Sequence, residues 1–200
     1  MNTKQFFMTA LVLGVTAGYG IAQETGAINV DSAATANESA NADMNGTSMT
    51  AENTMSSETQ KFMEEAAMGG MMEVKLGNMA LEKGSSSAVK DFGQRMVTDH
   101  TKAGDELMAL AQEKGVTLPD SMSAKQQHSV EKLSELSGEK FDQEYMKMMV
   151  KDHEKDVKSY EKASEKVPDA EVQDFAAKTL PTLKEHLQQA EEVNEQMRNS

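Results

Sequence analysis

Three histidines and one glutamate occupy positions from which they could bind a transition metal. His100, His153 and His186 each lie on the apolar face of a predicted helix, and Glu73 has the same setting on a fourth. Neutral imidazoles and carboxylates are common protein ligands of zinc and copper. In an apolar interior such groups must be paired or must bind something, so these four residues mark a candidate site.

Four long amphipathic segments position these residues. In each segment apolar side chains recur at spacings of three and four, which is typical of one face of an α-helix. We expect long helices over about residues 58–83, 87–114, 140–166 and 170–197, and a short helix over about 123–136. Each candidate residue lies near the middle of its long helix, so at a rise of about 1.5 Å per residue the four should meet in one layer.

This pattern predicts an all-α fold, because no segment shows the alternation that is typical of a strand. Four long helices joined by short turns form a four-helix bundle. The short helix lies between the second and third long helices, where it lets the chain cross over. Ser57 and Asp169 are the expected N-caps of the first and last helices. His128, in the short helix, lacks an apolar setting and is expected to be exposed.

Two adjacent glycines interrupt the first long helix. Gly69 and Gly70 should each cost about 1 kcal/mol of helix stability. We therefore expect them to allow the close approach of a neighbouring helix or to leave room for something bound.

The segments before the bundle indicate export. Residues 1–22 combine a basic start, an apolar run and a small-residue cleavage site, which predicts a signal peptide cleaved after Ala22. Residues 23–57 are polar and acidic with no helical period, as expected of a disordered linker. The bundle would then occupy residues 58–198. We expect the protein in the periplasm or elsewhere in the cell envelope, with no transmembrane helix in the mature chain.

The overall charge excludes some classes of partner. A net charge of −13 disfavours binding to nucleic acid and to anionic lipid. The chain contains no cysteine, which excludes disulfides, thiolate ligands and a lipid-modified cysteine. The envelope partner and the oligomeric state stay open at this point.

Three interpretations of the polar layer remain. The layer could be a metal site, with the carboxylates of Asp99, Asp152 and Asp156 orienting the imidazoles. It could be a structural layer in which Glu73 accepts hydrogen bonds from protonated histidines. It could also be a catalytic acid–base pair in a cleft.

Several sequence motifs are shared with a known family. They are residues 68–77, 92–101, 115–119, 141–146, the pair Asp152-His153 and residues 179–187. With these motifs the chain resembles the family DUF4142 over about residues 58–195. The resemblance implies a ferritin-like helical bundle in exported bacterial proteins, and it implies no established activity.

The chain departs from the pattern of ferritin-like di-iron proteins, which use Glu-x-x-His on two helices. Three residues before the histidines stand Val97, Val150 and Leu183. Zinc or copper therefore fits the residue types better than a di-iron centre. We expect a binding or stress-related module of the envelope rather than an enzyme, and we assign no catalytic residue. The alternatives are a metal-free structural or interaction protein and, third, a redox enzyme.

Overall fold

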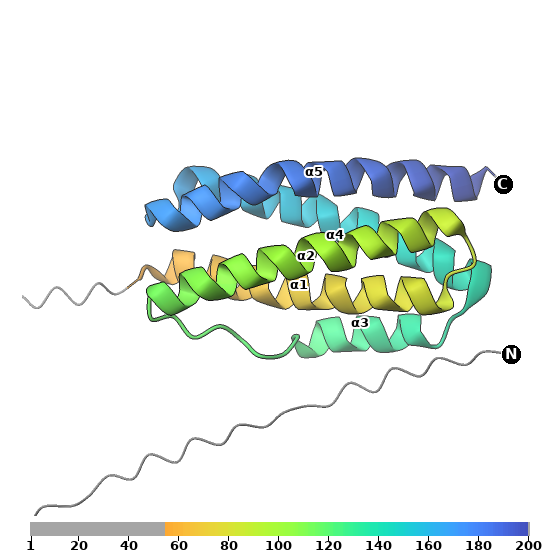
Figure 1. Ribbon diagram of the computed structural model, residues 1–200, viewed down its shortest axis with the longest axis horizontal. Coiled ribbons are helices and arrows are strands. Elements are labelled where there is room, and N and C mark those ends of the chain that lie inside the picture. Colours follow the sequence, from red (N-terminus) through yellow and green to blue (C-terminus); the bar gives the residue numbers. More distant parts are fainter. Residues whose placement is uncertain (1–54, 200) are drawn as a thin grey trace, which may run out of the picture. The chain divides into compact units, whose positions relative to one another are not determined.

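A computed structural model describes residues 55–199, which form a helical bundle (Figure 1). Its helices are α1 Ser57–Lys83, α2 Ser87–Glu113, α3 Ala124–Ser134, α4 Gly138–Lys166 and α5 Ala170–Arg198. No strand occurs in this range, and none of its helices combines the length and apolar character that a membrane span requires. The predicted all-α bundle with a short crossover helix is confirmed. The predicted signal peptide and residues 23–54 of the predicted linker lie outside the described residues.

The long helices form two antiparallel hairpins, α1 with α2 and α4 with α5 (Figure 1). The segment after α2 and the short helix α3 bring the chain back along the bundle to the end where α2 begins. As a result α4 runs in the same direction as α2, and α5 runs in the same direction as α1. This crossover gives the bundle its ferritin-like connectivity.

Glycines let α1 and α2 approach closely one turn after Glu73. A Cβ atom built on Gly77 would lie 2.7 Å from the carbonyl oxygen of Gly93, and one built on Gly93 would lie 2.7 Å from the Cβ of Ala80. The close helix approach that we considered for Gly69 and Gly70 is therefore found at Gly77 and Gly93. A Cβ on Gly69 or Gly70 would meet nothing within 4 Å.

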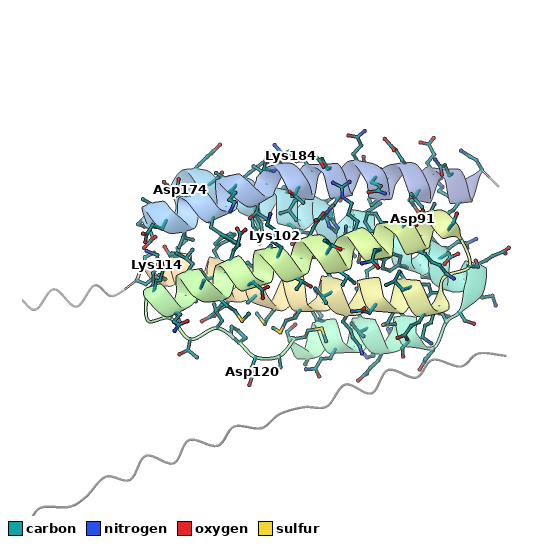
Figure 2. The ribbon with its side chains drawn as sticks, viewed as in Figure 1. Asp91, Lys102, Lys114, Asp120, Asp174 and Lys184 are labelled. Carbon is teal, nitrogen blue, oxygen red and sulfur yellow. The ribbon has the colours of Figure 1, made fainter. Side chains whose placement is uncertain are left out.

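Side-chain caps fix the helix ends. Ser56, not Ser57, caps α1: its backbone is extended and its hydroxyl accepts a hydrogen bond from the Thr59 amide at 3.1 Å, whereas Ser57 is already helical. Asp169 caps α5, as predicted. Lys114, at the end of α2, pairs with Asp169 at 2.7 Å and so joins α2 to the start of α5 (Figure 2).

A buried carboxylate joins the two hairpins at the opposite end. The Asp142 side chain on α4 accepts hydrogen bonds from the backbone amides of Ser85 and Ser86 and from the Ser85 hydroxyl, at 2.6–3.1 Å. These groups lie at the start of α2. The N-cap residue of that helix, Ser86, does not cap it with a hydrogen bond to its own side chain. Asp142, on α4, therefore supplies the hydrogen-bond acceptor that the backbone amides at the start of α2 need.

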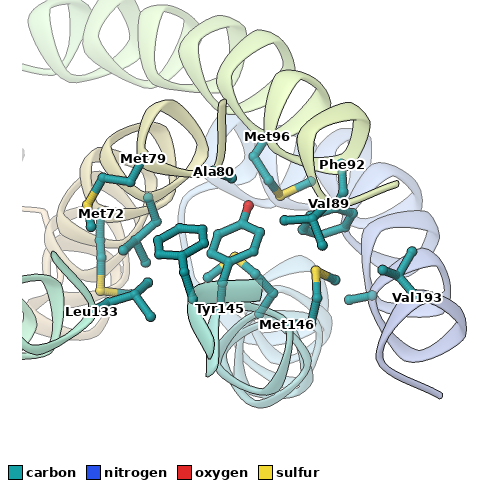
Figure 3. Packing of buried hydrophobic residues seen from close by; sticks show 14 of the residues in the cluster. Met72, Met79, Ala80, Val89, Phe92, Met96, Leu133, Tyr145, Met146 and Val193 are labelled. Carbon is teal, nitrogen blue, oxygen red and sulfur yellow. The ribbon is translucent and has the colours of Figure 1, made fainter. Parts of the chain in front are cut away.

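The core divides into two apolar clusters. The first, which we call the Phe92 cluster, consists of Met72, Leu76, Met79, Ala80, Val89, Phe92, Met96, Val130, Leu133, Phe141, Tyr145, Met146, Met149, Ala190 and Val193 (Figure 3). The second, the Phe175 cluster, consists of Phe62, Met63, Leu107, Ala111, Ala163, Val167, Val172, Phe175 and Ala176. Along α2, α4 and α5 the histidine lies at the boundary between the two clusters. The three histidines, with Glu73 beside them, thus form a polar layer between the two clusters.

Candidate metal centre

The four predicted residues come together from the four long helices. The side chains of Glu73, His100, His153 and His186 are buried, with relative exposures of 2, 7, 0 and 0%. One ring nitrogen from each histidine lies within 4.8 Å of the others. Glu73 borders this cluster, since its Oε2 atom is 2.9 Å from His100 Nδ1. The sequence predicted this convergence from the helix period and the mid-helix positions.

The backbone fixes the tautomer of His153. Its Nδ1 atom lies 2.9 Å from the carbonyl oxygen of Met149. A carbonyl oxygen can only accept a hydrogen bond, so Nδ1 carries the proton and donates it. The lone pair of the neutral ring is then on Nε2, which lies 3.4 Å from Glu73 Oε1.

Carboxylates orient the other two imidazoles. His100 donates from Nδ1 to Glu73 Oε2, and His186 donates from Nε2 to Asp99 Oδ2 at 2.8 Å. Burial alone would raise the pKa of Asp99, but its contacts with His186 and Arg95 lower it, so Asp99 is ionised. In both imidazoles the remaining nitrogen, Nε2 of His100 and Nδ1 of His186, carries the lone pair.

Three ring nitrogens and one carboxylate oxygen therefore meet in this layer. His100 Nε2, His153 Nε2, His186 Nδ1 and Glu73 Oε1 are buried and have no hydrogen-bond partner within residues 55–199. Burial lowers the pKa of His100 to about 4 and that of His186 to about 3, and it also lowers the pKa of His153. The three rings are neutral at pH 7, so they do not supply the missing protons.

These residues fit a transition metal ion. Zinc and copper bind the unprotonated nitrogen of imidazoles whose other nitrogen donates to a carbonyl or a carboxylate, which is the arrangement of all three histidines. Two nitrogens on a tetrahedral zinc lie about 3.3 Å apart. From separations of up to 4.8 Å, each nitrogen would move inward by less than about 1 Å to reach that geometry.

The predicted carboxylates have three different roles. Asp99 orients an imidazole as expected, although the ring is that of His186 on another helix. Asp156 faces Glu73: burial and the Glu73 carboxyl raise the pKa of Asp156 to about 9, and burial raises the pKa of Glu73. Asp152 pairs with the exposed Lys155 side chain at 2.9 Å. Glu73 orients His100 with one oxygen and turns the other toward the cluster.

Two partners of the site were not predicted. One is the Met149 carbonyl group, which no sequence pattern reveals. The other is Arg95, whose guanidinium contacts Asp99 at 3.3 Å, Gln189 at 3.2 Å and Glu185 at 2.5 Å. The spacing of Arg95 and Asp99, four residues apart on one helix, was a signal for the first of these contacts.

An aromatic ring separates the histidines from the Phe92 cluster. The Phe92 ring lies edge-on to His153 and His186, with centroid distances of 6.3 and 6.5 Å. The remaining histidine, His128, is on α3, with its side chain 64% exposed and 3.9 Å from Glu131. As predicted, it does not belong to the buried layer.

Comparison with known proteins agrees with this fold. The chain is similar to the crystal structure of a DUF305 fragment from Deinococcus radiodurans, with a TM-score of 0.63 and 15% sequence identity. The match covers 71% of this chain and 98% of that one, and at this identity it shows the fold alone. No curated protein matches the chain. The model of the family DUF4142, a domain of unknown function, matches residues 44–193. The chain therefore belongs to the DUF4142 family.

Proposed function

We propose that this protein binds one transition metal ion, zinc or copper, through His100 Nε2, His153 Nε2 and His186 Nδ1. The observation that carries the proposal is the meeting of these three buried lone pairs, none of which has a hydrogen-bond donor within residues 55–199. A water molecule has two hydrogens and cannot satisfy three acceptors. A metal cation interacts favourably with all of them at once.

The donor set favours zinc or copper over a di-iron centre. Three neutral imidazoles suit zinc and copper, whereas a di-iron site needs several carboxylates. Two carboxylates contact the histidines, and that of Asp99 accepts the His186 Nε2–H, which leaves only that of Glu73 beside the unprotonated ring nitrogens. Three imidazoles would leave a fourth ligand position on a tetrahedral zinc, and Glu73 Oε1, 3.4 Å from His153 Nε2, could fill it.

We place this binding function in the cell envelope. The support is the sequence of residues 1–22, which has the charge and hydropathy pattern of a signal peptide. A metal-binding or stress-related module of the envelope is the resulting proposal.

Metal binding is tested by elemental analysis and thermal unfolding of the purified chain. We expect about one equivalent of zinc or copper, and a stabilisation of about 2.7 kcal/mol when the free metal is at 100 times its Kd. His100→Ala/His153→Ala should lose both effects, while His128→Ala, which removes an exposed histidine, should keep them. Absence of metal together with no thermal shift in zinc or copper would overturn the proposal, as would equal binding by the double variant.

A metal-free structural or interaction protein is the second candidate. It is favoured by the raised pKa of Glu73, since a protonated Glu73 could donate from Oε1 to His153 Nε2 across their 3.4 Å separation. This candidate predicts that Glu73→Gln lowers the free energy of unfolding while the wild-type protein contains no metal. Stability measurements on samples with known metal content distinguish the two.

A further inference from the structure

A cavity of about 930 Å³ opens beside the histidine layer. Its walls come from α1, α2, α4 and the segment that connects α2 to α3. Its inner end is formed by Glu73 and His100, and its outer part by Met108, Val116 and Leu118. The volume lies within the range of about 300–1,000 Å³ that is typical of small-molecule sites.

Glycines and alanines make the space. Gly69, Gly70 and Gly104 line the cavity, and a Cβ built on any of them would meet nothing within 4 Å. Each glycine costs its helix about 1 kcal/mol relative to alanine. Unlike Gly77 and Gly93, these glycines are not needed for a close contact between helices. Because these glycines have no side chains, they leave the space of the cavity open.

The cavity is apolar with acceptors at its inner end. Met108, which lines the wall, is 59% exposed. Among the described residues it is the one large apolar side chain that is exposed. Glu73 and His100 are more than nine-tenths buried, and each has a polar atom without a hydrogen-bond partner, Oε1 and Nε2. Both atoms are buried behind the cavity wall, so a ligand donor would satisfy them once the Glu73 and His100 side chains turn toward the cavity.

The charges around the cavity select against anions. Its outer part carries three exposed acids, Glu65, Asp105 and Asp120, the last on the connection between α2 and α3 (Figure 2). Lys155 is the one basic residue among the described lining residues, and it is paired with Asp152. A carboxylate, sulfonate or phosphate ligand would therefore meet a negative potential.

We propose that this cavity binds an apolar amine, with the hydrocarbon part along the α1 and α2 walls and the N–H group toward Glu73 Oε1 and His100 Nε2. The apolar lining accounts for the body of the ligand, the two unpartnered acceptors account for its donor, and the acidic outer part accounts for its charge. The amine would use His100 Nε2 and Glu73 Oε1, which the proposed metal centre also uses, so it would bind the metal-free protein and is tested in the presence of chelator.

The first test compares two dyes that differ in charge. N-phenyl-1-naphthylamine is an uncharged aryl amine, and 1-anilinonaphthalene-8-sulfonate is the same amine with a sulfonate. We expect the uncharged dye to bind the full chain at one site and the sulfonate to bind about tenfold more weakly or worse. Dodecylamine should displace the bound dye best, dodecanol less well and dodecanoate least. All three are used below their micelle concentrations. Equal displacement by dodecanoate and dodecylamine would overturn the proposal.

The second test fills the cavity. Gly70→Leu/Gly104→Phe places two large side chains in the open space and should weaken dye binding by about tenfold or more. The matched control Lys75→Leu/Lys102→Phe adds the same side chains to exposed positions of α1 and α2 and should bind the dye as the wild type does. Circular dichroism verifies that both variants are folded. Undiminished binding by the folded cavity-filled variant would refute the cavity as the site.

Each dye titration is made with chelator and again with zinc. Dye binding in the chelator-treated protein tests the cavity alone. If the protein takes up zinc but binds no dye in chelator, the metal site is supported and the amine site is refuted. If it binds the dye but takes up neither zinc nor copper, the amine site is supported and the metal site is refuted.

Discussion

The same substitution at two positions of α1 should have opposite effects on stability. In Gly70→Ala the new methyl group meets nothing within 4 Å, so the variant gains only helix propensity, about 1 kcal/mol. For a domain of this size that raises Tm by about 2–4 °C. In Gly77→Ala the methyl group would lie 2.7 Å from the Gly93 carbonyl oxygen and 3.0 Å from a Val97 methyl group.

The backbone carbonyl group cannot rotate away, so in Gly77→Ala the helices must separate. Overpacking of this kind costs about 1–3 kcal/mol, which exceeds the gain in propensity. We expect Gly77→Ala to be less stable than the wild type by about 1 kcal/mol, and less stable than Gly70→Ala by about 2 kcal/mol. Because Gly77 lies one turn after Glu73, the separation should also lengthen the Glu73–His100 hydrogen bond and weaken zinc binding.

Urea denaturation of the two variants with chelator measures this difference, and zinc titration of the folded variants measures the effect on the site. If Gly77→Ala is as stable as Gly70→Ala, the contact between α1 and α2 does not depend on glycine and our account of the hairpin is wrong. If Gly77→Ala is destabilised but binds zinc normally, the hairpin spacing does not position Glu73.

Two further predictions concern buried carboxyl groups. Asp142→Asn replaces an acceptor of three hydrogen bonds with an amide that can satisfy fewer of them, so we expect a loss of about 1–3 kcal/mol in urea denaturation; a loss below about 0.5 kcal/mol would contradict the capping role. The second concerns pH. The pKa of Asp156 is raised from 3.8 to about 9, so the folded state keeps a proton that the unfolded state has lost, and stability should fall as pH rises toward 9. The histidines act in another window: their lowered pKa values reduce stability only below about pH 6.5. In chelator-treated protein, the fall in stability between about pH 7 and 9 should therefore be much smaller in Asp156→Asn than in the wild type. Equal slopes would refute the assignment.

The helices and the level of the polar layer could be predicted from the sequence, because both follow from spacing along one chain. The spacing of apolar residues predicted the four long helices. Glu73, His100, His153 and His186 lie near the middle of these helices, which predicted that they lie at one level of the bundle. Predicting the helix start at Ser57 was off by one residue because Ser56 and Ser57 are equally good caps. Only the backbone conformation distinguishes them.

The roles of the carboxylates could not be predicted from the sequence. Each role depends on which neighbouring helix packs beside the side of the helix that carries the carboxylate. Asp99 and Asp152 both stand directly before a histidine. The flank of α2 at Asp99 faces α5, so the carboxylate meets His186, whereas Asp152 meets Lys155 on its own helix. Likewise the sequence cannot tell that one oxygen of Glu73 orients His100 while the other lies 3.4 Å from His153 Nε2.

The distribution of the site over the hairpins has a consequence for folding. The α1–α2 hairpin supplies Glu73 and His100, and the α4–α5 hairpin supplies His153 and His186. Contacts within each hairpin are local in sequence and can form early, whereas contacts between the hairpins span the crossover and close a long loop. Neither hairpin alone holds three imidazoles, so an intermediate with one hairpin formed would have no complete binding site. Metal uptake would then report the docking step itself, and its rate would follow that step rather than helix formation.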